Sequence, residues 1–281
     1  MQNSQRPQNP IIMIAPNGAR KTKEDLRQIP ITPSELADEA RACMEAGASI
    51  VHLHVRDKNQ GHTLDAGAYR EAIAAIRDVV GDKMIIQATT EAVGIYQPDE
   101  QIAAVKELMP EAVSVAIREF IPSKEYEAAA GEFFHFLEDN NIWPQYILYS
   151  AEEIAYFADL KQRGLIPAKH DFVLFVLGKK QRVATAENFA KPEDLDVLLN
   201  AYKQTGLNLT WAVCAFGGHE NECMKYALAN GGNARIGFEN NHLLSDNNIA
   251  ASNADLVRQF VETARITPMN AQEIRKLYGL L

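Results

Sequence analysis

The feature that most constrains the fold is the regular alternation of short apolar runs with amphipathic helical segments. Eight such β-then-α units follow one another without a linker, a low-complexity segment or a break in composition. The expected strands cover residues 11–15, 49–57, 84–89, 112–117, 146–149, 171–177, 209–215 and 234–238. The expected helices cover residues 32–47, 65–80, 98–108, 123–140, 151–163, 192–204, 219–229 and 253–264.

Several of the expected strands are apolar along almost their whole length, which is typical of a sheet covered on both faces. Eight βα units in 281 residues predict a single (β/α)8 TIM barrel of class α/β. A doubly wound open sheet is the alternative, but no Gly-x-Gly-x-x-Gly turn follows any expected strand. We expect the barrel to span residues 10–281 and the polar residues 1–9 to form a flexible N-terminus.

One helix start is explicit in the sequence. Thr32 provides an N-cap, Pro33 occupies the first helical position, and Glu35 completes a capping box. Gly47 marks the expected end of the same helix.

Charge and cysteine content exclude several classes of function. The net charge of −9 without a basic cluster argues against a nucleic-acid surface. No run approaches the ~18 apolar residues of a membrane span, and the polar N-terminus lacks a signal peptide. The three scattered cysteines favour neither a disulfide framework nor a thiolate zinc site. These observations predict a cytoplasmic protein.

The second expected strand carries a His-x-His pair. Residues two apart in a strand point to the same side, so His52 and His54 share a face. Two imidazoles on a rigid strand make half of a metal site, whereas two satisfied core histidines are the structural alternative. In a barrel, reactive groups lie at the carboxyl ends of strands. Glu239 closes the eighth strand and is the expected third ligand, with a solvated or helix-capping carboxylate as its alternative.

Other strand ends also carry polar side chains. The candidates are Asn17 and Arg20 after strand one, Asp57 after strand two, Thr89, Thr90 and Glu91 after strand three, Ser114, Arg118 and Glu119 at strand four, His219 after strand seven, and Arg235 and Asn240 at strand eight. Lys179, Lys180 and Arg182 follow strand six and are interpreted as a solvated loop, with cofactor phosphate contacts as the alternative.

Four sequence blocks carry a resemblance to a known family. They are Ala-Pro-Asn-Gly-Ala-Arg at 15–20, the Thr-Pro helix start at 32–33, Val-His-Leu-His-Val-Arg-Asp at 51–57 and Arg-Ile-Gly-Phe-Glu-Asn-Asn at 235–241. In this order and separation they resemble the β-keto acid cleavage enzymes. The resemblance extends over roughly residues 10 to 265.

The resemblance implies a TIM barrel with a divalent metal, usually zinc, and a homo-oligomer, a tetramer in that family. It implies that a β-keto acid reacts with acetyl-CoA to give acetoacetate and a new acyl-CoA. By position, His52, His54 and Glu239 match the metal ligands. The expected catalytic residues are Arg235, Asn240 and Thr90, and the expected substrate-binding residues are Asn17, Arg20, Thr89, Thr90 and Ser114.

Two positions depart from the family member that cleaves 3-keto-5-aminohexanoate. Asn240 stands where that enzyme has aspartate, so an amide replaces a possible proton acceptor. Arg20 stands near its substrate-binding glutamate and would repel an ammonium group; the alternative is that its side chain points to solvent or pairs with Glu24 or Asp25. These departures predict a substrate other than the aminated hexanoate, with no positive charge at its far end.

Three other functions fit parts of the same pattern. A metal-dependent hydrolase of the amidohydrolase type also uses His-x-His in a barrel, but the fifth and sixth expected strands end without an obvious His ligand. A retro-aldol lyase acting on an acyl-CoA would use metal and barrel without a second substrate. A barrel that only binds a ligand is the third alternative, and the polar strand ends argue against it.

Overall fold

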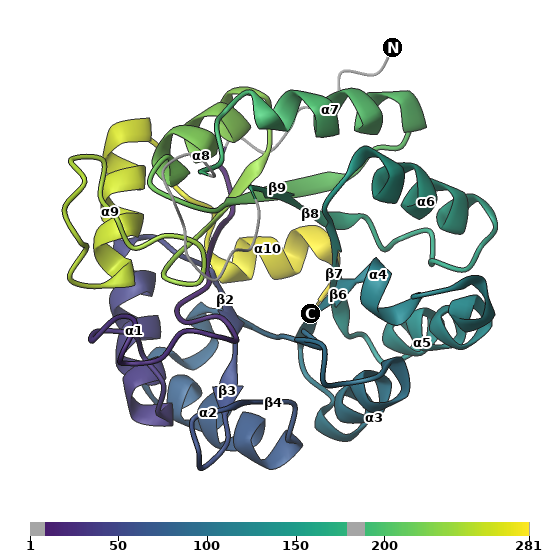
Figure 1. Cartoon of the computed structure of the whole chain (residues 1–281), viewed down its shortest axis with the longest axis horizontal. Helices are drawn as coiled ribbons and strands as arrows, with labels where there is room; N and C mark the ends of the chain where they lie inside the picture. Colours follow the sequence, from purple (N-terminus) through teal and green to yellow (C-terminus); the bar gives the residue numbers. More distant parts are fainter. Residues whose placement is uncertain (1–8, 179–188, 281) are drawn as a thin grey trace.

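A computed structural model of the chain describes residues 9–178 and 189–280. Its central element is a closed barrel of parallel strands in the order β1-β10-β9-β8-β7-β6-β5-β2 (Figure 1). The barrel strands are β1 (Ile12–Ile14), β2 (Ile50–Leu53), β5 (Ile85–Ala88), β6 (Ala112–Ala116), β7 (Trp143–Leu148), β8 (Phe172–Leu177), β9 (Thr210–Ala215) and β10 (Asn233–Ile236). The TIM barrel expected from the sequence is therefore confirmed, and the open sheet is excluded by the β1–β10 pairing.

Helices surround this barrel, and α10 (Ala271–Tyr278) lies across one end of it. They are α1 (Pro33–Ala46), α2 (Ala66–Val80), α3 (Pro98–Leu108), α4 (Ile117–Phe120), α5 (Glu127–Asp139), α6 (Ala151–Gln162), α7 (Asp194–Thr205), α8 (Glu220–Ala229), α9 (Asn253–Ala264) and α10 (Ala271–Tyr278), with short 3-10 turns η1 (Gly81–Lys83) and η2 (Lys124–Tyr126). Within the described ranges, no helix is long and apolar enough to cross a membrane.

The strands are buried on both faces, as their apolar composition predicted. In β1, Met13 belongs to the core inside the barrel, whereas Ile12 and Ile14 belong to the core between strands and helices. This alternation follows from the two-residue period of a strand. The capping box of α1 is also confirmed: Glu35 N–H donates to Thr32 Oγ1, and Thr32 N–H donates to the Glu35 carboxylate.

Most expected strands differ from the structure by one or two residues at an end, and two differ by more. The second one divides at His54, because Val55–Arg56 (β3) pairs with His62–Thr63 (β4) in a separate two-stranded sheet. The fifth begins at Trp143 rather than residue 146. Pro144 is tolerated there because Trp143 N–H already donates to Glu111 on the β6 side, while pairing with β8 starts only at Tyr146.

Helix α10 was not expected from the sequence, and it closes the amino-terminal end of the barrel. Its Tyr278 ring lies 4.8 Å from the Trp143 ring at the start of β7. The Tyr278 hydroxyl is 2.6 Å from that of Thr210, which begins β9. With this end closed, the carboxyl ends of the strands are the end of the barrel that is left for a site.

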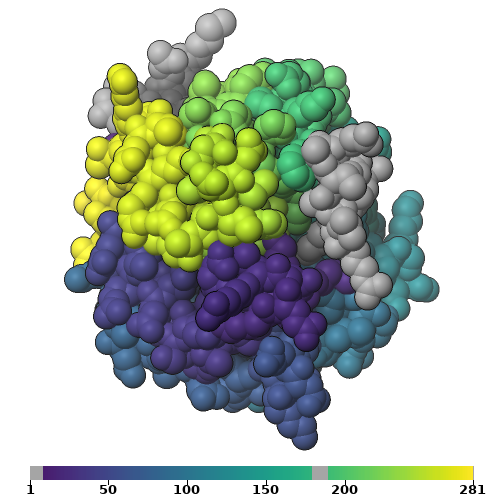
Figure 2. Space-filling model, turned by 60° about the vertical axis from the view of Figure 1, so that its left-hand side comes forward, coloured from purple at the N-terminus to yellow at the C-terminus, as the bar shows by residue number. Residues whose placement is uncertain are grey.

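The first and last parts of the chain meet along one seam of the barrel. Strand β1 pairs with β2 on one side and with β10 on the other. The space-filling view shows the purple N-terminal and yellow-green C-terminal regions in contact along the surface (Figure 2). The expected flexible segment 1–9 falls almost wholly outside the described residues, so it stays a prediction.

Candidate active site

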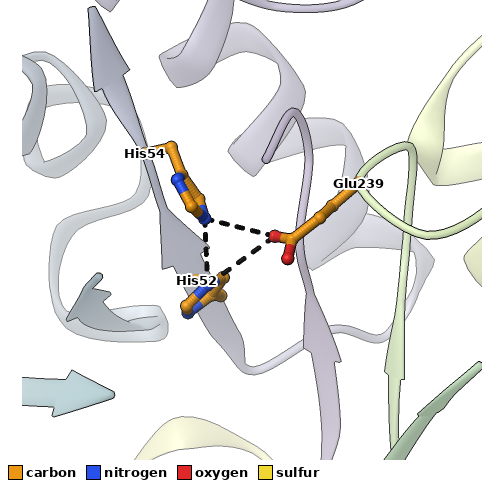
Figure 3. A group of neighbouring side chains, drawn as sticks. All are labelled: His52, His54 and Glu239. Carbon is orange, nitrogen blue, oxygen red and sulfur yellow. Dashed lines mark hydrogen bonds and ion pairs between the residues drawn. The ribbon is translucent and has the colours of Figure 1, made fainter. Parts of the chain in front are cut away.

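Three side chains converge at the carboxyl end of the barrel, beside the β1–β10 seam (Figure 3). His52 lies in β2, His54 follows β2, and Glu239 follows β10. The Nε2 atoms of the two histidines are 3.2 Å apart. Oε2 of Glu239 lies 3.3 Å from His54 Nε2 and 3.6 Å from His52 Nε2. The residues that the sequence selected as metal ligands therefore present three ligand atoms to one point.

The size of this triangle fits a metal ion. A tetrahedral zinc site with bonds of about 2.0–2.1 Å has edges of about 3.3–3.4 Å between its ligand atoms. The three measured edges lie on either side of that value. Within the described chain, Oε2 of Glu239 is buried and accepts no hydrogen bond, so its lone pair is available to an ion. Two imidazoles and one carboxylate leave a fourth position for water or substrate.

The protonation of these groups also suits metal binding, which requires neutral imidazole and ionised carboxylate. Burial lowers the pKa of His54 well below its usual range, which keeps the ring neutral. Burial alone would raise the pKa of Glu239, but the Arg235 guanidinium together with His54 and His52 holds that pKa well below its usual range. Burial and neighbouring charge therefore favour a neutral His54 ring and an ionised Glu239 carboxylate, the forms that bind a metal.

A chain of side-chain amides inside the barrel orients His52. The ring Nδ1 lies 2.8 Å from Gln87 Oε1 and donates to it, which leaves the Nε2 lone pair facing the site. Gln87 Nε2 donates to Gln145 Oε1 at 3.3 Å, and Gln145 Nε2 contacts Met13 Sδ at 3.3 Å. The His54 carbonyl accepts a bond from Asn17 Nδ2 at 3.1 Å. The histidines are thus held by groups on several strands.

The turn that carries Glu239 is held by buried polar groups. Gly237 N–H donates to Glu220 Oε1 at 3.2 Å, and Phe238 N–H donates to Asn253 Oδ1 at 2.7 Å. Lys21 donates from Nζ to the Phe238 carbonyl. Burial raises the pKa of Glu220 to about 8. This network fixes the direction in which the Glu239 carboxylate points.

Gly18 makes the close approach of two loops possible. It adopts φ of +63°, and a Cβ built there would lie 2.6 Å from Glu239 Cγ. A side chain at this position would therefore push directly on Glu239, one of the three candidate metal ligands. The Gly18 carbonyl also accepts a hydrogen bond from Arg56, which ties the loop after β1 to β3.

Arg235 is the buried cation of the site. Its Nη2 lies 3.1 Å from Glu239 Oε1, 3.3 Å from Asn240 Oδ1 and 3.3 Å from Cys214 Sγ. Within the described residues, Arg235 Nε, Asn240 Nδ2 and Asn17 Oδ1 are buried without hydrogen-bond partners. Buried polar atoms are normally satisfied, so a cluster of unsatisfied ones marks a place for a polar ligand.

A cavity opens above these groups and has three kinds of wall. The side nearest the candidate metal ligands carries His52, Glu239 and Arg235. The β5–β6 side carries hydroxyls and carboxylates, and the β7–β9 side carries mainly apolar and aromatic groups. The residues of the β5–β6 side are Thr89, Thr90, Glu91, Ser114, Ala116 and Glu119, and those of the β7–β9 side are Ile147, Tyr149, Val176 and Phe216.

The residues expected to bind substrate divide into two groups. Thr89, Thr90 and Ser114 line the cavity, and Thr90 Oγ1 donates to the Ser114 carbonyl at 2.7 Å. Asn17 and Asn240 are buried behind the lining, next to His54 and Arg235. Arg20 is exposed and is not among the described residues that line the cavity. Lys179, Lys180 and Arg182 lie outside the described residues.

Several supporting residues were missed in the sequence. Gln87 and Gln145 are polar side chains in the middle of otherwise apolar strands, and this contrast could have identified both. Glu220 and Asn253 occupy the first turns of their helices, where polar residues usually cap the helix. No local signal separates these two from ordinary capping residues, because their role depends on the fold of the 237–241 turn.

Comparison with known proteins shows which family the chain resembles in sequence. The model of the β-keto acid cleavage enzyme family matches residues 10–280. The 3-keto-5-aminohexanoate cleavage enzyme of Fusobacterium nucleatum is 30% identical over 95% of this chain and 97% of its own. The 3,5-dioxohexanoate:acetyl-CoA acetone transferase of Paraburkholderia graminis is 27% identical over 96% of each chain.

Among solved structures, the apo structure of ObcA superposes with a TM-score of 0.70 at 15% identity. The match covers 90% of this chain, which spans 65% of the length of the ObcA chain. This likeness shows the barrel fold alone. The family model covers His52 and His54 near the start of the chain and Glu239 near its end. The chain belongs to the β-keto acid cleavage enzyme family.

Proposed function

We propose that the protein transfers the carboxymethyl part of a β-keto acid to the acetyl group of acetyl-CoA, with a zinc ion held by His52, His54 and Glu239. The bond between C2 and C3 of the keto acid breaks, and C2 forms a new bond to the acetyl carbonyl carbon. The CoA thiolate leaves the acetyl group and ends on the former C3 carbonyl. The products are acetoacetate and a new acyl-CoA, and the overall reaction needs neither water nor an oxidant.

The observation that carries the proposal is the triangle of ligand atoms beside a buried arginine in one cavity. A bound divalent ion would act as a Lewis acid on the keto oxygen and stabilise the charge that develops there. Arg235 is placed to bind the substrate carboxylate through a charge-assisted hydrogen bond. The hydroxyls of Thr89, Thr90 and Ser114 line the neighbouring wall and are placed to orient the reacting groups.

Asn240 has a different role from a base. Its Oδ1 accepts a hydrogen bond from Arg235 Nη2 at 3.3 Å. A carboxamide has no useful basicity near neutral pH, so Asn240 positions the guanidinium and does not take a proton. The relatives named for transfer to or from acetyl-CoA support the same class of reaction for this chain.

Product analysis with and without acetyl-CoA tests the proposal. Metal-loaded protein should convert a β-keto acid to acetoacetate and acyl-CoA only when acetyl-CoA is present. Formation of cleavage products from an acyl-CoA alone would indicate a retro-aldol lyase, and hydrolysis of amide substrates would indicate an amidohydrolase. Metal content is measured in parallel by elemental analysis, and loss of bound zinc in His54→Ala and Glu239→Ala checks the ligand set.

The proposal also covers the oligomeric state of the protein and its cellular compartment. We propose a homo-oligomer, with the tetramer of the resembling family as the specific expectation, measured by light scattering after gel filtration. The described cysteines Cys43, Cys214 and Cys223 are buried and unbridged, which supports a reducing cytoplasm as the working compartment.

A further inference from the structure

The hydroxyl of Tyr149 is a polar group of the cavity wall that the proposed reaction leaves unassigned. Along β7, Leu148 packs in the core between strands and helices, whereas Trp143 packs in the core inside the barrel. Ile147 and Tyr149 also pack against the inner core. Because residues two apart in a strand share a face, Tyr149 continues the inner face of β7 just beyond the end of the strand. Its ring therefore lies inside the barrel, at the carboxyl end.

Tyr149 stands across the barrel from the candidate metal ligands. Strand β7 lies halfway round the closed barrel from β1. His52 lies in β2 and Glu239 follows β10, and both of these strands pair with β1. Tyr149 nevertheless lines the same cavity as His52 and Glu239, and its phenol group interacts electrostatically with Arg235. A molecule that fills this cavity therefore meets the candidate metal ligands on one side and Tyr149 on the other.

Two neighbouring side chains hold Tyr149 in place. Its backbone N–H donates to Glu153 Oε2 at 2.8 Å. The Arg118 guanidinium lies over the Tyr149 ring, 3.2 Å from the ring centroid, and Arg118 Nε is 3.6 Å from Glu153 Oε1. Glu153 thus contacts both the backbone of Tyr149 and the cation stacked on its ring. Within the described residues, no hydrogen bond engages the Tyr149 hydroxyl, so it is available to a ligand.

The surroundings keep this hydroxyl protonated. Burial raises the pKa of Tyr149, and the Arg118 guanidinium acts in the opposite direction. The Glu119 and Glu91 carboxylates raise the pKa further, and the net shift of the pKa is upward. At neutral pH the phenol therefore remains an O–H group that can donate a hydrogen bond.

The wall around Tyr149 limits which reacting oxygen its hydroxyl can serve. The other described residues on the β7–β9 side of the cavity, Ile147, Val176 and Phe216, have no polar side-chain group. In the proposed function, the metal acts on the keto oxygen and Arg235 binds the substrate carboxylate, so the keto acid is held from the opposite side. The remaining oxygen that gains negative charge is the acetyl carbonyl oxygen of acetyl-CoA, and it needs a donor of its own.

From this placement we propose that Tyr149 is a further catalytic residue, whose hydroxyl donates a hydrogen bond to the acetyl carbonyl oxygen of acetyl-CoA. The inference rests on the proposed function, because it assigns a donor to the second substrate of that reaction. When C2 of the keto acid bonds to the acetyl carbon, the C=O electron pair moves onto the oxygen. The pair returns when the bond to the CoA sulfur breaks and the thiolate leaves. Tyr149 stabilises the charged oxygen in between and keeps its proton throughout.

Tyr149→Phe tests the assignment, because it removes the hydroxyl and keeps the ring beneath Arg118. Acetoacetate formation is measured with zinc-loaded protein, a β-keto acid and acetyl-CoA. Loss of a donor to a charged oxygen predicts that kcat falls about a hundred-fold or more, while KM for the keto acid changes little. Tyr156→Phe is the matched control, because the Tyr156 hydroxyl donates to Glu127 and is not part of the described cavity lining. It should keep the kcat of the parent.

A second measurement separates the acetyl carbonyl from the rest of CoA. The thioether S-ethyl-CoA has a methylene group in place of that carbonyl, so it offers no oxygen to Tyr149. It should inhibit the parent and Tyr149→Phe with equal inhibition constants. If Tyr149→Phe weakens inhibition by this analogue as much as it lowers kcat, the hydroxyl acts on another part of CoA and the assignment is overturned.

Failure of the inference differs from failure of the proposed function. No acetoacetate from the parent with any β-keto acid would refute the proposed function. An active parent whose kcat is matched by Tyr149→Phe would overturn the role of Tyr149 alone. So would a raised KM for the keto acid at unchanged kcat, because the hydroxyl would then bind the other substrate. Loss of zinc or of stability in Tyr149→Phe, measured by elemental analysis and urea unfolding, would make the hydroxyl structural and also overturn its catalytic assignment.

Discussion

Replacing Gly18 with alanine tests how tightly the loop after β1 supports the metal site. The new Cβ would lie 2.6 Å from Glu239 Cγ, and ordinary contact begins at about 3.4 Å. One of the two loops must therefore move by about 0.8 Å. Such a displacement is large against metal–ligand bonds of ~2.0–2.2 Å, so we expect zinc affinity to fall at least about ten-fold, or ~1.4 kcal/mol.

The substitution also has a backbone cost that must be separated from the effect on the metal. Gly18 has φ of +63°, where a side chain costs about 1–2 kcal/mol of folding stability. Gly206 has φ of +67°, and no described atom lies within 4 Å of a Cβ built there. Gly206→Ala is thus the matched control, with the same strain and no contact with Glu239.

The assay measures zinc affinity by competition with a chelator and stability by urea unfolding of the metal-free proteins. Both variants should lose similar stability, and Gly18→Ala alone should lose zinc affinity. If Gly18→Ala binds zinc within two-fold of the parent, Glu239 is not held against this glycine and the reasoning fails.

Three further predictions follow from the groups around the site. Gln87→Leu should lower zinc affinity about ten- to a hundred-fold in chelator competition, because His52 loses the acceptor of its Nδ1–H; parent-like affinity would show that Gln87 does not orient the ring. Asn240→Asp should keep the metal, measured by elemental analysis, and change mainly the rate or its pH profile; loss of the metal would make residue 240 a ligand. Glu220, whose pKa is raised from 4.5 to about 8, binds more protons in the folded than in the unfolded protein between these values, so its contribution to stability falls as pH rises, by up to about 1.4 kcal/mol per pH unit. Glu220→Gln should therefore gain stability relative to the parent from pH 5 to pH 8 in urea unfolding, and a constant difference would contradict the raised pKa.

The barrel and the convergence of His52, His54 and Glu239 could be predicted from short patterns in the sequence. Strand–helix alternation gave the fold, and the His-x-His spacing with a strand-end carboxylate gave the three residues whose ligand atoms converge. Helix α10 was missed because it closes the barrel rather than continuing the βα repeat. The bounds of β7 were missed because Pro144 argues locally against a strand.

The direction of individual side chains depends on packing that the sequence does not encode locally. The place of Arg20 after strand one left both a substrate contact and a solvent-facing side chain open, and the side chain is exposed. Glu91 and Glu119 were recognised only as polar strand ends, and their common wall became evident once β5 and β6 were paired. The roles of Glu220 and Asn253 needed the path of the 237–241 turn.

The position of the candidate metal ligands at the β1–β10 seam has a consequence for folding, should they hold the proposed zinc. The histidines come from the first quarter of the chain and the glutamate from the last, with β1 between them. During synthesis the three ligands cannot meet until β10 has been made and the barrel has closed. An ion bound there would link β2 to the segment after β10, so the barrel could not open at this seam until the ion is released. Zinc should therefore slow unfolding more than it speeds refolding, since its complete binding site exists only after closure.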